Sequence, residues 1–110
     1  MTQANFRESL VMHRSLGLSE SALAGFCQAN HIRRLSLFGS QLKGTARDES
    51  DVDILVEFDA EHVPTLFGMA RMEKALSDLI GRPVDLRTPA DLSRYFRHEV
   101  LNTAEVQYAA

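Results

Sequence analysis

Residues 51–58 alternate between apolar and mainly acidic side chains, and no other stretch of the chain constrains the fold so strongly. Successive side chains of a strand point to opposite faces of the sheet, so every second residue shares a face. The apolar positions are Val52, Ile54, Val56 and Phe58. The opposite face begins with Asp51 and Asp53. Because the apolar face must lie against a core, we predict a strand in a sheet that is covered on one side.

The chain has 110 residues and contains no long linker rich in proline, glycine or serine, so we expect a single domain over residues 1–110. Weak apolar spacing over residues 4–14 makes residues 1–17 an N-terminal helical extension in this prediction. The other expected elements, in chain order, are a helix from Ser19 to about Asn30, a strand at 32–38, a polar loop at 41–50, a helix from Pro64 and Thr65 to Gly81, a strand at 83–87, a helix from Thr88 to about Leu101 that buries Leu92, Phe96 and Val100, and a short strand at 106–108. These elements predict an α+β fold.

Asp51 and Asp53 place two carboxylates on one face of the predicted strand. Their backbones would lie about 6.6 Å apart, from a rise of ~3.3 Å per residue, so their oxygens can converge on one or two ions. Mg²⁺ takes oxygen ligands and keeps waters and substrate phosphates in its remaining positions. The pair therefore predicts a site for nucleotide-bound Mg²⁺.

A glycine and a serine follow the strand that precedes this loop. Gly39 would allow the backbone to approach a ligand without a Cβ, and Ser40 would add a hydroxyl and an N–H, so together they could hold phosphate. Lys43 and Arg47 are close enough in sequence to add positive charge to the same nucleotide site. The sequence leaves open which of the two points inward, and we favour Lys43.

Asp85 lies in the middle of the strand predicted at 83–87, where an unpaired buried carboxylate would be costly. We predict that it is a third metal ligand and that it takes, or directs, the proton of an attacking hydroxyl. The alternative is a structural ion pair with Arg82 or Arg87.

The spacing of these motifs resembles a known signature. Leu37-Phe38-Gly39-Ser40, then ten residues, then Asp51-Val52-Asp53, is similar to the pattern of the DNA polymerase β nucleotidyltransferase superfamily. A chance match to its four fixed positions has odds of roughly one in a thousand in a chain this long. Through Val84-Asp85-Leu86 to Tyr108, the whole chain resembles the minimal nucleotidyltransferases, or MNT proteins. The resemblance implies a polymerase β-like fold, with a small mixed sheet and helices packed on one face. One departure is Gln41, where many relatives carry a basic residue.

The resemblance also implies a function. MNT proteins act as antitoxins of HEPN-domain ribonuclease toxins, so we expect transfer of AMP from ATP to a toxin tyrosine, and a hetero-oligomer with that toxin. Two Mg²⁺ ions with bound ATP would be the cofactors, ligated by Asp51, Asp53 and Asp85. Two alternatives stay open: a non-catalytic antitoxin that acts by stoichiometric binding, and nucleotidyl transfer to a small-molecule acceptor.

The composition argues against some other functions and locations. The net charge of -3 and the pI near 5.7 argue against direct, stable binding to nucleic acid. We expect a cytoplasmic protein, since the sequence shows neither a signal peptide nor the ~20 apolar residues of a membrane helix. Cys27 is the only cysteine, so there is no internal disulfide, and its apolar surroundings predict a buried thiol. The four histidines have no spacing typical of a metal site, and we interpret them as ordinary residues.

Overall fold

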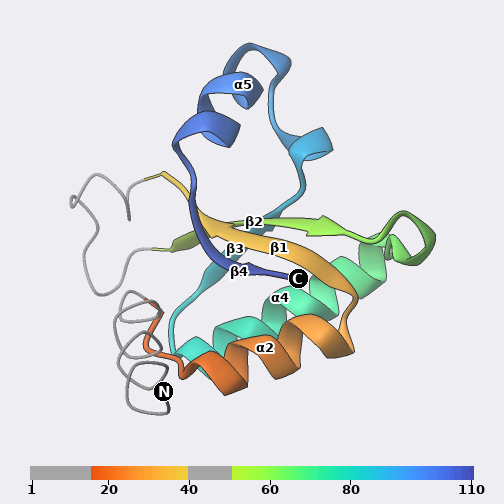
Figure 1. Cartoon of the computed structure of the whole chain (residues 1–110), viewed down its shortest axis with the longest axis vertical. Helices are drawn as coiled ribbons and strands as arrows, with labels where there is room; N and C mark the ends of the chain where they lie inside the picture. The colour runs from red at the N-terminus through yellow and green to blue at the C-terminus, as the bar shows by residue number, and fades with distance from the viewer. Residues whose placement is uncertain (1–15, 40–50) are drawn as a thin grey trace.

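A four-stranded sheet forms the centre of the protein in the computed structural model, which describes residues 16–39 and 51–110 (Figure 1). The strands are β1 (Ile32–Leu37), β2 (Val52–Phe58), β3 (Val84–Arg87) and β4 (Glu105–Ala109). Their order across the sheet is β3-β2-β1-β4. Strand β1 runs antiparallel to both β2 and β4, whereas β3 runs parallel to β2. The sheet is therefore mixed, which confirms the predicted α+β class.

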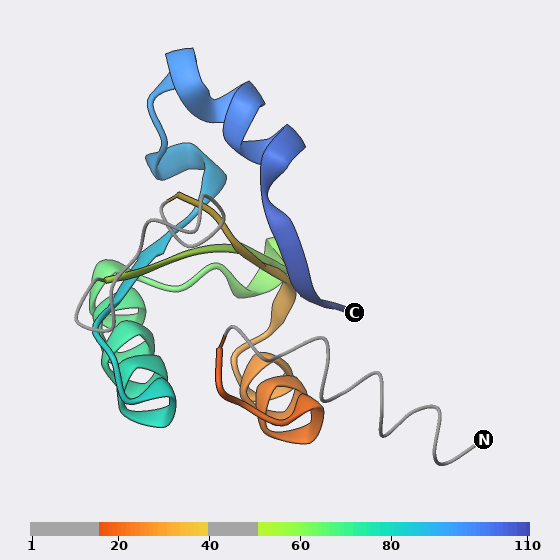
Figure 2. The ribbon, with the colours of Figure 1, turned by 90° about the vertical axis from the view of Figure 1, so that its left-hand side faces the viewer.

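Two helices, α2 (Glu20–Ala29) and α4 (Leu66–Ile80), lie on the same face of the sheet (Figure 2). Both begin where a side chain can replace a missing backbone partner: Ser19 accepts from Ala22 N–H, and Thr65 accepts from Gly68 N–H, each at 3.1 Å. Helix α4 ends at Gly81, whose φ of 80° is left-handed and therefore favours glycine. The predicted boundaries of both helices are confirmed to within a residue or two.

The core lies between these helices and the sheet, and the alternation of β2 creates it. Val52, Ile54 and Val56 are fully buried, as predicted. Helix α2 contributes Leu23 and Cys27 at a spacing of four residues, so they share one helix face. The polar face of β2 consequently points away from both helices, and the candidate site residues lie on that face.

Strand β3 is an edge strand, and side chains of α4 bond to its free backbone edge. The Ser77 hydroxyl accepts from Val84 N–H at 3.0 Å, and the Glu73 carboxylate accepts from Leu86 N–H at 2.9 Å. An unpaired strand edge would expose hydrogen-bonding groups to another chain. These two bonds satisfy the donors on either side of Asp85 and fix the strand that carries it.

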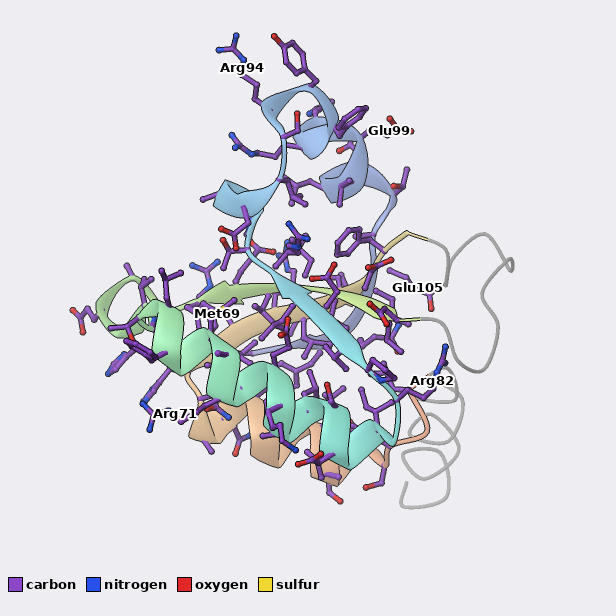
Figure 3. All side chains as sticks on the ribbon, turned by 180° about the vertical axis from the view of Figure 1, so that it is seen from behind. Met69, Arg71, Arg82, Arg94, Glu99 and Glu105 are labelled. Atoms are coloured by element: carbon purple, nitrogen blue, oxygen red, sulfur yellow. The ribbon has the colours of Figure 1, made fainter. Side chains whose placement is uncertain are left out.

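The helix predicted from Thr88 to about Leu101 is wrong in its course and in its burial. Thr88 and Asp91 close a capping box around a single 3-10 turn, η2 (Pro89–Asp91), so the chain becomes extended again at Leu92. Ser93 then caps a separate helix, α5 (Arg94–Thr103), which has no buried residue. Figure 3 shows Arg94 and Glu99 of this helix projecting away from the sheet. Phe96, expected in the core, is instead 61% exposed.

Some of the remaining predictions are confirmed, and others concern residues that the structure does not describe. The last short strand is confirmed as β4, and Cys27 is buried, which raises the pKa of its thiol to about 12. The helix expected over residues 4–14 and the loop at 41–50 lie outside the described residues. In the part of the chain that the structure describes, no helix is long and apolar enough to cross a membrane.

Candidate active site

The turn after β1 lies directly against the carboxylate of Asp53. Gly39 has a φ of 76°, and a Cβ at this position would come within 2.5 Å of Asp53 Oδ2. That separation is shorter than any ordinary contact, so only glycine fits the turn without moving the carboxylate. The backbone supports the same arrangement, because Phe38 N–H donates to the carbonyl of Asp53 at 3.1 Å. The structure therefore places the predicted phosphate-binding glycine beside the predicted metal ligand.

Asp85 is the cross-strand neighbour of Asp53. The parallel register pairs Asp53 with Asp85, between the buried pairs Val52 with Val84 and Ile54 with Leu86. Side chains alternate along each strand, so both aspartates project from the sheet face that α2 and α4 leave uncovered. Two carboxylates that stand 32 residues apart in sequence thus become neighbours in space.

The alternative prediction for Asp85, an ion pair with Arg82 or Arg87, is confirmed for Arg87. The guanidinium of Arg87 donates to both carboxylate oxygens of Asp85, from Nε at 3.0 Å and from Nη2 at 3.3 Å. The carboxylate raises the pKa of Arg87, first through this hydrogen bond and then through charge attraction. Both side chains are partly exposed, at 47% for Arg87 and 34% for Asp85, so solvent screens the pair.

Asp51 lies just before β2 and is exposed. Its side chain shares the face of Asp53 by alternation, as predicted. The other predicted ligands of the nucleotide, Ser40, Lys43 and Arg47, lie outside the described residues. Their roles, like the ligation by the three aspartates, stay predictions.

The residue types of this face suit a hard divalent cation, although the oxygens of the three aspartates do not all lie within 4.8 Å of one another. Asp51, Asp53 and Asp85 offer carboxylate oxygens only, which suits Mg²⁺ rather than a metal that prefers nitrogen or sulfur. The backbone of the turn can lie against the Asp53 carboxylate only because residue 39 has no side chain. A phosphate bound by this turn would lie next to the same carboxylates.

One cluster of titratable side chains was missed by the sequence reasoning. His31, Asp59 and His62 bring one ligand atom each within 4.8 Å of one another, which no other group of three His, Cys, Asp or Glu side chains in the described residues does. The two histidines are 31 positions apart, so sequence spacing gave no signal. Only the pairing of β1 with β2 brings them together.

Comparison with known proteins decides the family of this site. The profile of the nucleotidyltransferase domain family matches residues 20–106, which includes every described element of the site. The chain belongs to this family. The resemblance read from the Gly-Ser and Asp-x-Asp motifs is thereby confirmed.

Individual proteins that are similar to this nucleotidyltransferase-family chain support the same family. The protein adenylyltransferase MntA of Thermococcus cleftensis is 39% identical over 77 residues, which cover 70% of this chain and 74% of the relative. A solved structure of a minimal nucleotidyltransferase superposes with a TM-score of 0.64 at 36% identity, covering 76% of this chain and 84% of its own. A Shewanella oneidensis complex of a tri-AMPylated HEPN toxin with an MNT antitoxin gives a TM-score of 0.62 at 16% identity, covering 90% and 73%. The last likeness shows the fold alone.

Proposed function

We propose that this chain is an antitoxin that transfers AMP from ATP to a tyrosine hydroxyl of a HEPN-type partner protein. The observation that carries the proposal is the position of the Gly39 turn against Asp53, with Asp85 beside Asp53 on the next strand. The 39% identical relative named as a protein adenylyltransferase supports the reaction class. The Shewanella complex supports the class of partner.

In this reaction the acceptor oxygen forms a bond to the α-phosphorus of ATP while the bond from that phosphorus to the pyrophosphate oxygen breaks. Pyrophosphate leaves with the electron pair, and the hydroxyl proton passes to Asp85 or to water that Asp85 orients. The turn at Gly39 would hold the phosphates in line. Mg²⁺, held by Asp51, Asp53 and Asp85, would supply positive charge beside the attacking and leaving oxygens.

Arg87 sets a condition on this mechanism. Each oxygen of Asp85 accepts one bond from Arg87 and keeps a second lone pair, but the guanidinium charge disfavours a proton or a metal ion on the same carboxylate, so we expect Arg87 to move aside when either binds. The exposure of both side chains makes that rearrangement inexpensive, because water can replace the lost contacts. Arg87 would then be free to contact a phosphate oxygen of the nucleotide.

The acceptor in this proposal is a protein because α5 has the properties of a contact surface. Its aromatic residues Tyr95 and Phe96 are 79% and 61% exposed, and none of its residues is buried. Aromatic side chains are enriched at protein interfaces. A partner that covered α5 would bury apolar area that this chain leaves in water.

A second candidate function is neutralisation by binding alone. The Asp85–Arg87 pair favours it, since a carboxylate already neutralised by arginine is a poorer metal ligand. In that case the α5 surface would suffice for function, and the aspartates would be idle.

The test is labelling with ATP that carries ³²P at the α position, in Mg²⁺, with the product of the neighbouring gene as acceptor. Asp53→Asn should abolish label on the partner while the complex still forms on a sizing column. Asp78→Asn is the matched control, because Asp78 is exposed on α4 and forms an ion pair with Lys74 on the same helix. Full neutralisation of the partner by Asp53→Asn would favour binding alone, and unchanged labelling by that variant would refute the assigned site.

A further inference from the structure

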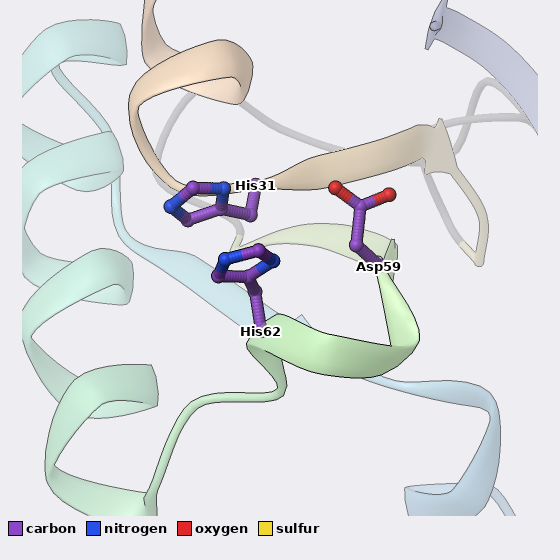
Figure 4. Close-up of side chains that lie close together, drawn as sticks. All are labelled: His31, Asp59 and His62. Carbon is purple, nitrogen blue, oxygen red and sulfur yellow. The ribbon is translucent and has the colours of Figure 1, made fainter.

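His31, Asp59 and His62 lie close together (Figure 4). They stand at the end of the β1–β2 pair opposite to Gly39 and Asp53. His31 immediately precedes β1, Asp59 immediately follows β2, and His62 ends the 3-10 turn η1 (Ala60–His62). Asp59 stands six positions after Asp53 along β2 and its end, which corresponds to about 20 Å at ~3.3 Å per residue. The cluster is therefore separate from the candidate active site.

The backbone holds these three residues in a fixed arrangement. Asp59 N–H donates to the carbonyl of His31 at 3.1 Å, and His62 N–H donates to the carbonyl of Asp59 at 2.9 Å. His31 has a φ of 58°, a conformation that non-glycine residues adopt infrequently.

The two imidazole rings are stacked, with centroids 3.8 Å apart and planes 7° from parallel. Two nitrogens on one tetrahedral Zn²⁺ lie about 3.3 Å apart, given Zn–N bonds of ~2.0–2.1 Å. The ligand atoms of the three side chains lie within 4.8 Å of one another, so small movements would bring two nitrogens to that distance. Stacked rings point their lone pairs in parallel directions, so binding requires a ring rotation, and the exposure of His31 and His62 leaves room for it.

We propose that His31, His62 and Asp59 bind a divalent transition-metal ion of the Zn²⁺ class. Two imidazole nitrogens and one carboxylate oxygen form a donor set that such ions prefer, whereas Mg²⁺ prefers oxygen alone. Water would complete the coordination. The bound ion would join the turn between α2 and β1 to the segment that leads from β2 into α4, and would thereby stabilise the folded state.

A cationic side chain lines the same pocket and allows a test of whether the pocket binds a cation or an anion. Arg71 of α4 lines a pocket of about 440 Å³ together with His31 and His62. Its charge opposes a metal ion and would favour an anion. Arg71→Ala should therefore leave the Zn²⁺ affinity unchanged or raise it. If the pocket were instead an anion site, Arg71→Ala would lower its affinity for the anion.

The experiment is calorimetric titration of the tag-free full chain with Zn²⁺, without nucleotide, together with NMR of the histidine ring signals. We expect one ion per chain, shifts of two histidines, and a raised melting temperature. His62→Ala and His31→Asn should each weaken binding roughly tenfold or more, by comparison with the 10–100-fold losses seen for supporting residues of metal sites. Asparagine tolerates the left-handed conformation of residue 31, so that variant should still fold.

Two controls separate this site from others. His98→Ala removes another exposed histidine, which contacts Asn102 on α5, and should not change the affinity. Asp53→Asn removes a carboxylate of the candidate active site and should also leave the Zn²⁺ affinity unchanged, so the two proposals can fail separately. Zn²⁺ binding that survives His62→Ala, or no binding of one ion per chain by the wild-type protein, would overturn the inference.

Discussion

Gly39→Ala should reduce nucleotidyl transfer far more than it reduces stability. The φ of 76° at this position is left-handed, and alanine there costs about 1–2 kcal/mol. That cost corresponds to a drop in melting temperature of roughly 4–8 °C per kcal/mol in a domain near this size. The new methyl group would also meet Asp53 Oδ2 at 2.5 Å, so the carboxylate would have to move.

The displacement of Asp53 determines the catalytic loss. Its side chain can rotate away from the methyl group, which limits the effect on folding, but a shift of about 1 Å in a reacting group can cost roughly 100-fold in rate. We therefore expect kcat/KM for AMP transfer to fall about 100-fold. The assay is initial-rate labelling of the partner with α-labelled ATP, run beside thermal unfolding followed by circular dichroism.

Gly17→Ala is the matched control for this prediction. Gly17 has a φ of 69°, yet among the described residues, its two chain neighbours aside, no atom lies within 4 Å of the position that a Cβ would take. This variant carries the same backbone cost without the clash, so it should melt at a similarly lowered temperature and keep its activity. If Gly39→Ala and Gly17→Ala retained equal activity, the close approach of the turn to Asp53 would have no catalytic role.

Three further changes test other parts of the structure. Burial raises the pKa of Cys27 from 9.0 to about 12, so the unfolded chain loses this proton first, and the free energy of unfolding should fall as pH rises from about 9 towards 12. Cys27→Ala should remove this slope in urea titrations at a series of pH values. Glu73→Ala leaves Leu86 N–H without its acceptor and should cost about 1–3 kcal/mol, measured by urea unfolding, whereas Glu73→Gln keeps an acceptor and should cost less. Leu76→Ala removes a fully buried side chain and should cost about 2–5 kcal/mol in the same measurement; a loss below 1 kcal/mol would contradict its place in the core.

Local patterns predicted most of the elements because each depends on interactions between near neighbours. The alternation in β2 follows from the two-residue repeat of a strand, and Thr65 and Gly81 mark the two ends of α4 through hydrogen bonding and a left-handed φ. The same reasoning failed beyond β3. Thr88 and Asp91 do form the predicted capping box, but it closes one turn only.

The error at α5 has a physical cause that the pattern did not reveal. Its apolar residues follow helical spacing, which normally indicates a face turned to the core. Burial, however, also requires another element within reach, and α2 and α4 already cover one face of the sheet while α5 stands away from it (Figure 2). Phe96 is therefore exposed although its spacing is typical of a core residue.

Motif spacing and residue type within a few positions were enough to predict most of the elements, the family and the acidic strand face. Only the tertiary structure decided which distant residues meet. The parallel register places Asp85 opposite Asp53. The antiparallel pairing of β1 and β2 joins His31 to His62. Such contacts depend on strand order and register, which are set by the packing of the whole sheet and not by any one segment.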